Sequence, residues 1–175
     1  IPLRLVGSEM CIRDSFSLYL DASGDPLYQR GFRAASVEAP IKENLAAGII
    51  ELSGWKPGQA FLDPMCGSGT FLIEAALIAT NQAPGLKRDF GFMAWKNFDK
   101  ALFKNIKKSY QNAIIQKDFL RIYGSDKDLR AIRVSKKNLV LAGFEDCIQL
   151  ACKQFNELKP PLDEGVLVTN PPYGE

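Results

Sequence analysis

The chain has 175 residues, of which 46% are hydrophobic and 24% charged, with 22 lysine and arginine residues against 20 aspartate and glutamate residues. This is the composition of a folded globular domain, and it excludes intrinsic disorder. A membrane span would need a run of about 18 apolar residues, and the sequence has no such run. The chain has no histidine, the commonest general base and metal ligand, and its net charge of +2 is too small to indicate a nucleic-acid partner by itself.

The first fifteen residues do not read like the rest of the chain. Segment 5–15, LVGSEMCIRDS, resembles the translation of a sequencing-library adapter. It lacks the basic start and the apolar core of about 7–15 residues that a signal peptide needs. We therefore expect residues 1–15 to be an artefact, and we expect an upstream domain to be missing from this sequence.

Two elements are predicted before residue 55. Residues 16–33 resemble a hairpin, because FSLYLD and LYQRGF alternate apolar and polar positions around the turn ASGDP. Residues 40–53 resemble a helix, with Pro40 in the first turn, apolar residues at helical spacing and Gly54 as its cap.

From residue 59 onward, short apolar runs alternate with helical patterns. Strands are predicted at 59–63, 120–125, 147–152 and 165–169, and helices at 70–80 and 129–141. Residues 84–120 form an insertion, which has its own predicted helix near 99–116. Strands that alternate with helices indicate parallel βαβ units. The expected fold class is therefore α/β, a partial doubly wound Rossmann-like sheet with strand order 3-2-1-4.

A glycine loop, DPMCGSGT, joins the first of these strands to its helix at residues 63–70. Gly67 and Gly69 allow a backbone to approach a ligand closely. A dinucleotide site needs a third glycine where Leu72 stands, and a phosphate loop needs a lysine after Gly69. S-adenosylmethionine remains, because Asp63 suits its ammonium group and the turn suits its carboxylate. A ligand-free tight turn is the alternative.

A second carboxylate, Asp126, ends the next strand. In that position it can accept hydrogen bonds from both hydroxyls of a ribose, as in dinucleotide-binding folds, although a solvated surface aspartate is the alternative. Asp128 is expected to cap the helix that follows.

The motif Asn170-Pro171-Pro172-Tyr173 follows the fourth strand. The prolines fix the backbone and leave the carbonyls of Asn170 and Pro171 free to accept hydrogen bonds. The Asn170 side chain is another acceptor, and Tyr173 offers an aromatic face for stacking a planar group. These features suit a flat molecule with an exocyclic amine, which becomes nucleophilic without a histidine or a metal.

Four cysteines stand without CxxC spacing, at Cys11, Cys66, Cys147 and Cys152. Neither a zinc site nor a disulfide framework is expected, and a reducing, cytoplasmic compartment is the simplest interpretation.

Together, DPMCGSGT, GSDKD and NPPYGE resemble the Rossmann-type amino methyltransferases that use S-adenosylmethionine. The flanking segments RGFRAASVEAPIKENLAAGIIELSGW and APGLKRDFGFMAW are more specific. They resemble the bacterial large-subunit rRNA guanine-N2 methyltransferases of the RlmL type, over residues 17–175. That family implies an upstream RNA-binding THUMP domain, and rRNA as the substrate.

The resemblance assigns roles to individual residues. The residues that it assigns to the cofactor are Asp63, Pro64, Cys66, Gly67, Ser68 and Gly69 in the loop, and Asp126 at the ribose. The residues that it assigns to the target amine are Asn170, Pro171, Pro172 and Tyr173. The helix that begins at Ala39-Pro40-Ile41-Lys42 matches a family element that helps hold the methionine end of the cofactor. Gln154 stands where the family commonly has an aspartate that contacts adenine. Cys66 lies in the cofactor loop and is not expected to act as a nucleophile.

The expected organisation is an artefact at 1–15, a hairpin and linker at 16–38, and the N-terminal part of a methyltransferase domain at 39–175. Because the chain stops at Glu175, we expect later strands of the sheet to be missing. Alternatives are an amino methyltransferase for DNA adenine or cytosine or for a protein glutamine, and an inactive cofactor-binding fragment. No membrane or metal partner is expected, and the sequence does not indicate an oligomeric state.

The insertion is basic, with nine lysines and arginines against three aspartates between Pro84 and Arg121: Lys87, Arg88, Lys96, Lys100, Lys104, Lys107, Lys108, Lys117 and Arg121 against Asp89, Asp99 and Asp118. Such an excess can follow RNA phosphates. The alternative is a solvated helix face above a core formed by the interleaved aromatic residues.

Overall fold

The computed structural model describes residues 19–32, 40–116 and 120–172. The expectations for residues 1–15 and for Tyr173 lie outside these ranges. The elements in chain order are α1 (Glu43–Leu52), β1 (Phe61–Asp63), α2 (Thr70–Ala79), the 3-10 helix η1 (Gly91–Ala94), α3 (Lys100–Asn112), β2 (Ile122–Asp126), α4 (Leu129–Ala142), β3 (Ile148–Cys152), the 3-10 helix η2 (Phe155–Glu157) and β4 (Val166–Leu167).

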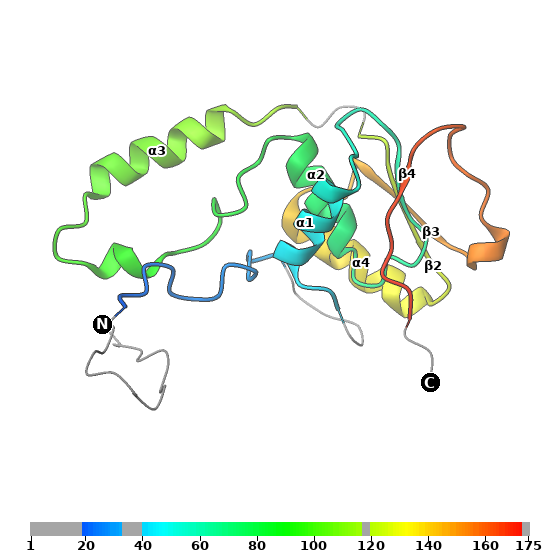
Figure 1. Ribbon diagram of the computed structural model, residues 1–175, viewed down its shortest axis with the longest axis horizontal. Coiled ribbons are helices and arrows are strands. Elements are labelled where there is room, and N and C mark those ends of the chain that lie inside the picture. The colour runs from blue at the N-terminus through cyan, green and yellow to red at the C-terminus, as the bar shows by residue number, and fades with distance from the viewer. Residues whose placement is uncertain (1–18, 33–39, 117–119, 173–175) are drawn as a thin grey trace, which may run out of the picture.

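The four strands form one parallel sheet in the order β3-β2-β1-β4 (Figure 1), which confirms the predicted order and the α/β fold class. In the register, Asp63 of β1 lies opposite Gly124, and Asp126 at the end of β2 lies opposite Cys152. Leu62 pairs with Leu167 of β4. Because the strands are parallel, their carboxyl ends meet at one edge of the sheet, where ligands bind in open α/β folds.

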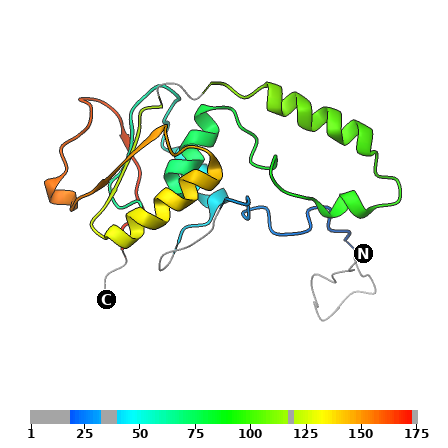
Figure 2. The same ribbon diagram turned by 180° about the vertical axis from the view of Figure 1, so that it is seen from behind.

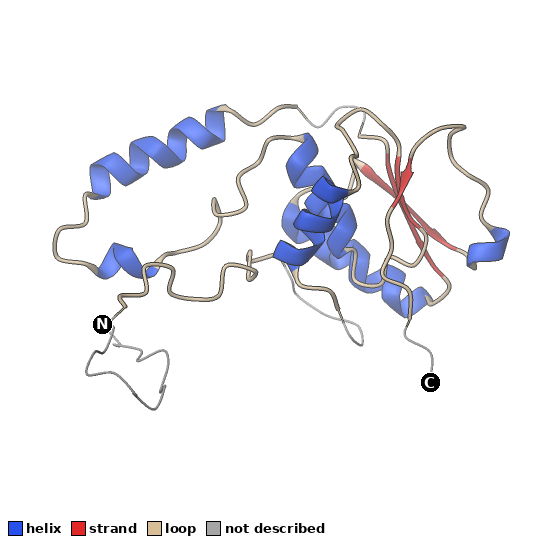
Figure 3. Ribbon diagram, in the orientation of Figure 1, coloured by secondary structure: helices blue, strands red, loops and turns tan. Residues whose placement is uncertain are grey.

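Helices α1, α2 and α4 gather on one side of the strands (Figure 3). Helix α2 packs against β1, β2, α1 and α4, which explains why it is apolar nearly all round and almost entirely buried. A Cβ at Gly124 would collide with the Leu72 side chain, so this glycine allows α2 to approach β2 closely. The core that surrounds α2 thereby fixes the start of the helix, where the glycine loop ends.

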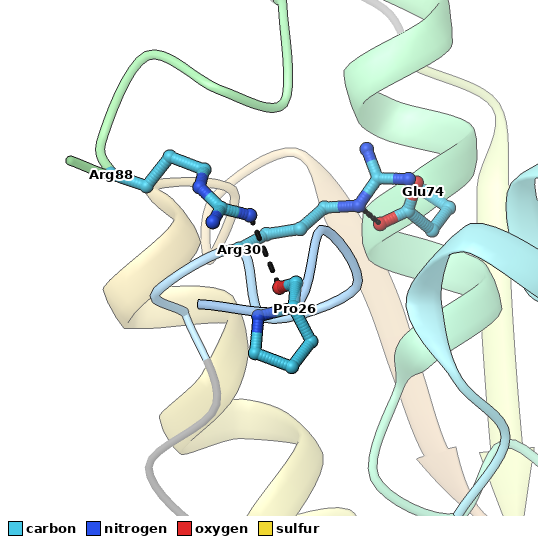
Figure 4. A network of polar contacts seen from close by, with 4 residues as sticks. All are labelled: Pro26, Arg30, Glu74 and Arg88. Carbon is cyan, nitrogen blue, oxygen red and sulfur yellow. Dashed lines mark hydrogen bonds and ion pairs between the residues drawn. The ribbon is translucent and has the colours of Figure 1, made fainter. Parts of the chain in front are cut away.

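The predicted hairpin is wrong for the described residues 19–32, which form turns and contain no strand. This segment lies along the insertion instead. The Phe92 N–H donates to the Ala22 carbonyl at 3.0 Å. The buried Arg88 donates to the carbonyls of Ser23, Asp25 and Pro26, as Figure 4 shows for Pro26. The segment is thus held to the insertion through its backbone carbonyls, whereas Tyr19, Leu20 and Leu27 of the alternating pattern are exposed.

Helix α1 begins later than predicted. Lys42 is extended, with ψ of 141°, so Pro40 precedes the helix instead of lying in its first turn. Gly54 follows the helix with φ of +74°, as expected of a residue at a helix end.

The insertion carries α3 away from the sheet (Figures 1 and 2), and α3 has no buried residue. The aromatic residues of the insertion contact one another: Phe90, Phe92, Trp95, Phe98 and Phe103. These rings form a half-buried cluster that lies apart from the main hydrophobic core. No helix in the described ranges is both long enough and apolar enough for a membrane crossing.

Candidate functional site

A pocket opens at the carboxyl ends of β1 and β4. It is lined by Pro40, Ile41, Asp63, Met65, Cys66, Gly67, Ser68, Thr70, Phe71 and Asn170. Five of the residues predicted for the site are among them: Asp63, Cys66, Gly67, Ser68 and Asn170. The segment before α1, which was expected to help hold the ligand, contributes Pro40 and Ile41.

The glycine loop has the backbone that its sequence predicts. Gly67 has φ of +52° and Gly69, the residue at the start of α2, has φ of +81°. The Gly69 N–H donates to the Cys66 carbonyl at 2.7 Å and closes the turn. A Cβ at Gly69 would lie 3.1 Å from the Ser135 hydroxyl oxygen, so both backbone conformation and space favour glycine here.

Two residues that support this loop were missed by the sequence analysis. The Ser135 hydroxyl donates to the Gly67 carbonyl at 2.7 Å, and the Asn138 amide donates to the Ser68 carbonyl at 3.0 Å. Both side chains are buried on α4, at 0% and 2% exposure. The available signal was a pair of polar residues three positions apart on the apolar face of a predicted helix.

The carboxylate of Asp126 holds the other side of the loop. Its Oδ2 accepts from the Gly67 N–H at 3.0 Å, and its Oδ1 accepts from the Asp128 N–H at 2.9 Å. Asp128 itself caps α4 by accepting from the Arg130 N–H, as predicted. Each oxygen of Asp126 keeps a further lone pair, so the carboxylate can still accept from a ribose hydroxyl.

Asp63 is the buried acid of the pocket, with 1% exposure. Burial raises its pKa from 3.8 to about 7; a hydrogen bond from the Met65 N–H, at 3.1 Å, opposes this rise, and repulsion from Asp126 adds to it. Among the described residues, the one ion pair joins Arg30 to Glu74, so no described cation neutralises Asp63. A cationic group of a ligand would supply the missing charge.

Cys66 is buried in the same pocket, 3.8 Å from the Ser135 hydroxyl. Burial, with repulsion from Asp63, raises the pKa of its thiol. The thiol therefore stays protonated and is a poor nucleophile. Cys66 is therefore unsuited to the role of a nucleophile, which the sequence analysis did not assign to it.

The remaining predicted residues lie around the pocket rather than on its wall. Pro64 is fully buried, and its carbonyl accepts from the Ser125 hydroxyl at 3.1 Å. Pro171 and Pro172 are exposed. Gln154 is exposed beyond the end of β3 and does not line the pocket. Within the described ranges no group of acidic and cysteine side chains could hold a metal ion.

These groups fit S-adenosylmethionine. A buried carboxylate without a cation faces the space where an ammonium would lie. The glycine loop at the start of α2 can receive a carboxylate. Asp126, on the neighbouring strand, borders the pocket through the Gly67 N–H, and a carboxylate has the chemistry to accept from a ribose hydroxyl. The chemistry of the set thus matches both charges of the methionine end and the sugar.

Comparison with known proteins gives a consistent result. Residues 30–175 match the family model described as UPF0020, RMKL-like, methyltransferase domain. The chain is 46% identical over 169 residues to the ribosomal RNA large subunit methyltransferase K/L of Psychromonas ingrahamii, covering 93% of this chain and 22% of that protein. The chain thus spans about a fifth of that relative's length.

Two solved structures are similar at a TM-score of 0.83 and cover 89% of this chain. One is the methyltransferase SMU.472 in complex with SAH, at 44% identity and 40% of its length. The other is from Listeria monocytogenes strain 4b F2365 and is named a predicted N6-adenine-specific DNA methylase, at 41% identity and 41% of its length.

Proposed function

Because this chain belongs to the RMKL-like methyltransferase domain family, we propose that it transfers a methyl group from S-adenosylmethionine to guanine N2 in large-subunit rRNA. The observation that carries the proposal is the pocket in which Asp63, the glycine loop and Asn170 meet. A cofactor carboxylate site and a target-amine motif then share one cavity. We assign residues 39–175 to the methyltransferase domain and place the protein in the cytoplasm.

The loop residues hold the methionine end of the cofactor in this proposal. Asp63 accepts the ammonium group, and Asp126 accepts from the ribose while it holds the Gly67 N–H. When bound, the cofactor supplies an electrophilic methyl group on a sulfonium. Gln154 is exposed just after β3, and we assign it to the adenine.

The target amine is held by acceptors at the end of β4. The Asn170 side-chain oxygen and the Pro171 carbonyl accept its two hydrogens, which turns the nitrogen lone pair toward the methyl group, and Tyr173 stacks on the base. Orientation and fixed dipoles supply most of the acceleration. The chain has no histidine to serve as a general base. The nitrogen would gain the methyl group as the C–S bond breaks, and its proton would then pass to solvent, leaving the methylated amine and S-adenosylhomocysteine.

The RNA surface is the insertion in this proposal. Two groups of its cations differ: Arg88 and Lys87 are bound to carbonyls of the chain, whereas the four lysines of α3 have no hydrogen bond or ion pair among the described residues. Lys100, Lys104 and Lys108 are exposed and lie one helical turn apart. Helix α3 carries no acidic residue, so this stripe is suited to RNA phosphates.

The test is methyl transfer to competing substrates. The chain is incubated with S-adenosylmethionine labelled in its methyl group, together with rRNA, duplex DNA or a release factor. The proposal predicts label in rRNA alone. Label in DNA would favour the activity named for the Listeria relative, label in the release factor would favour glutamine methylation, and cofactor binding without any transfer would favour an inactive fragment. Each of these three results overturns the proposal.

A further inference from the structure

We propose that Ser135 and Asn138 of α4 are positioning residues that set the glycine loop in the conformation that binds the methionine end of the cofactor. This inference rests on the proposed function. The two side chains lie three positions apart on one face of α4 and donate to consecutive carbonyls of the loop, those of Gly67 and Ser68. Neither side chain lines the pocket, so both act through the loop.

Both hydrogen bonds are shielded from water. Ser135 is 0% exposed and Asn138 is 2% exposed. Removing a buried donor leaves the carbonyl partner without a replacement from solvent. The loop can then recover a partner only by turning a peptide group, which changes the surface that faces the pocket.

The direction of the carbonyls matters for the ligand. In a trans peptide the N–H points away from the C=O. Because α4 holds the Gly67 oxygen, the N–H of Ser68 points to the opposite side, where Ser68 lines the pocket. The Ser135 side chain thus fixes the dipole of the Gly67–Ser68 peptide group. Its negative end, the C=O, points away from an anionic ligand, and its positive end, the N–H, points toward it.

Gly67 is held at both of its peptide groups. Its N–H is bound by Asp126 and its carbonyl by Ser135, and Asp126 precedes the N-terminus of the same helix that carries Ser135. The position of α4 therefore fixes the ribose carboxylate and the methionine loop together. A change in either α4 side chain is expected to weaken cofactor binding without altering the acceptors at Asn170.

The experiment compares Ser135→Ala and Asn138→Asp with the unchanged chain. Asparagine and aspartate have nearly the same shape, but the carboxylate cannot donate to the Ser68 carbonyl. Calorimetric titration with S-adenosylhomocysteine gives the cofactor affinity, and steady-state methyl transfer to rRNA gives kcat and the KM for the cofactor. We expect the Kd and this KM to rise about tenfold in each variant, with kcat within about twofold.

A matched control separates positioning from general stability. Leu139 is on the same helix, is 1% exposed and belongs to the hydrophobic core, so Leu139→Ala lowers the Tm without removing a loop contact. The proposal predicts normal cofactor affinity for this control at temperatures where it is folded. Ser135→Ala removes a single hydroxyl group and is a smaller change than Asn138→Asp. It can therefore still be tested if Asn138→Asp does not fold.

Unchanged cofactor affinity in folded Ser135→Ala and Asn138→Asp would overturn the proposal, as would a fall in kcat at constant KM. Equal loss of affinity in Leu139→Ala would also overturn it, because the effect would then follow stability alone. Absence of methyl transfer by the unchanged chain would contradict the proposed function instead. The calorimetric comparison would still decide the role of the two α4 residues.

Discussion

Replacing Asp63 with asparagine is expected to stabilise the ligand-free chain while it weakens cofactor binding. Asp63 is buried, and its pKa is raised from 3.8 to about 7. Between these two pH values the folded chain binds a proton that the unfolded chain has released. Stability therefore falls as pH rises through this window. Asparagine keeps an oxygen that can accept from the Met65 N–H and carries no charge.

The size of the effect follows from the pKa. A shift from 3.8 to about 7 corresponds to a cost of about 4 kcal/mol once Asp63 is ionised in the folded chain, at about 1.4 kcal/mol for each pH unit. At pH 5 only the unfolded chain has lost its proton, and the cost is about 2 kcal/mol. Asp63→Asn should thus raise the free energy of unfolding by these amounts, with the larger gain at pH 8.

Cofactor binding should change in the opposite sense. An ammonium buried against an ionised Asp63 forms a charge pair, and removing one partner of such a pair costs about 3 kcal/mol or more, or over a hundredfold in affinity. In the unchanged chain the affinity should also fall as pH drops below about 7, because Asp63 becomes protonated.

Denaturant unfolding at pH 5 and pH 8 and calorimetric titration with S-adenosylhomocysteine measure these two effects. A variant that is less stable than the unchanged chain at pH 8, or that binds the ligand equally well, would refute the reasoning.

Three further predictions concern the glycine loop, the Arg30–Glu74 ion pair and the lysines of α3. Gly69→Ala should destabilise the chain by about 1–2 kcal/mol and weaken ligand binding, because φ is +81° and the new Cβ lies 3.1 Å from the Ser135 hydroxyl. The control is Gly48→Ala in helix α1, where the new Cβ meets open space. Thermal unfolding should show this control to be stabilised by about 0.5–1 kcal/mol. Arg30→Gln removes the ion pair to Glu74 at 3.2 Å. Burial already raises the pKa of Glu74 to about 7 and Arg30 lowers it, so the loss of stability should be larger at pH 8 than at pH 5 in denaturant titrations, and an equal loss at both would contradict this. Lys104→Gln with Lys108→Gln should reduce the slope of log K against log salt for single-stranded RNA by about 1.4, and an unchanged slope would exclude these lysines from the RNA surface.

Local patterns were sufficient to predict the sheet. Each strand lies in a short apolar run; Asp63 and Asp126 are the last residues of β1 and β2, and Asn170 follows β4 by three positions. Chain connectivity then determines the strand order, because right-handed crossovers leave few alternatives. The glycine loop was predictable because glycine adopts without strain the positive φ that Gly67 and Gly69 have in this tight turn.

Contacts between distant segments could not be predicted in this way. The segment at 19–32 alternates like a strand, yet its carbonyls are bound by Arg88, more than 60 positions away in the chain. Ser135 and Asn138 are nearly 70 positions from the loop that they hold. No local pattern reports such a partner, so a buried polar pair on an apolar helix face was the strongest available signal.

Nucleoside mass spectrometry tests the central claim most directly. The chain and its Asn170→Ala variant are incubated with rRNA and S-adenosylmethionine that carries a deuterated methyl group, and the RNA is digested to nucleosides. The account predicts deuterated N2-methylguanosine with the unchanged chain and none with the variant, although both bind S-adenosylhomocysteine. Label on any other nucleoside, or equal methylation by Asn170→Ala, would contradict it.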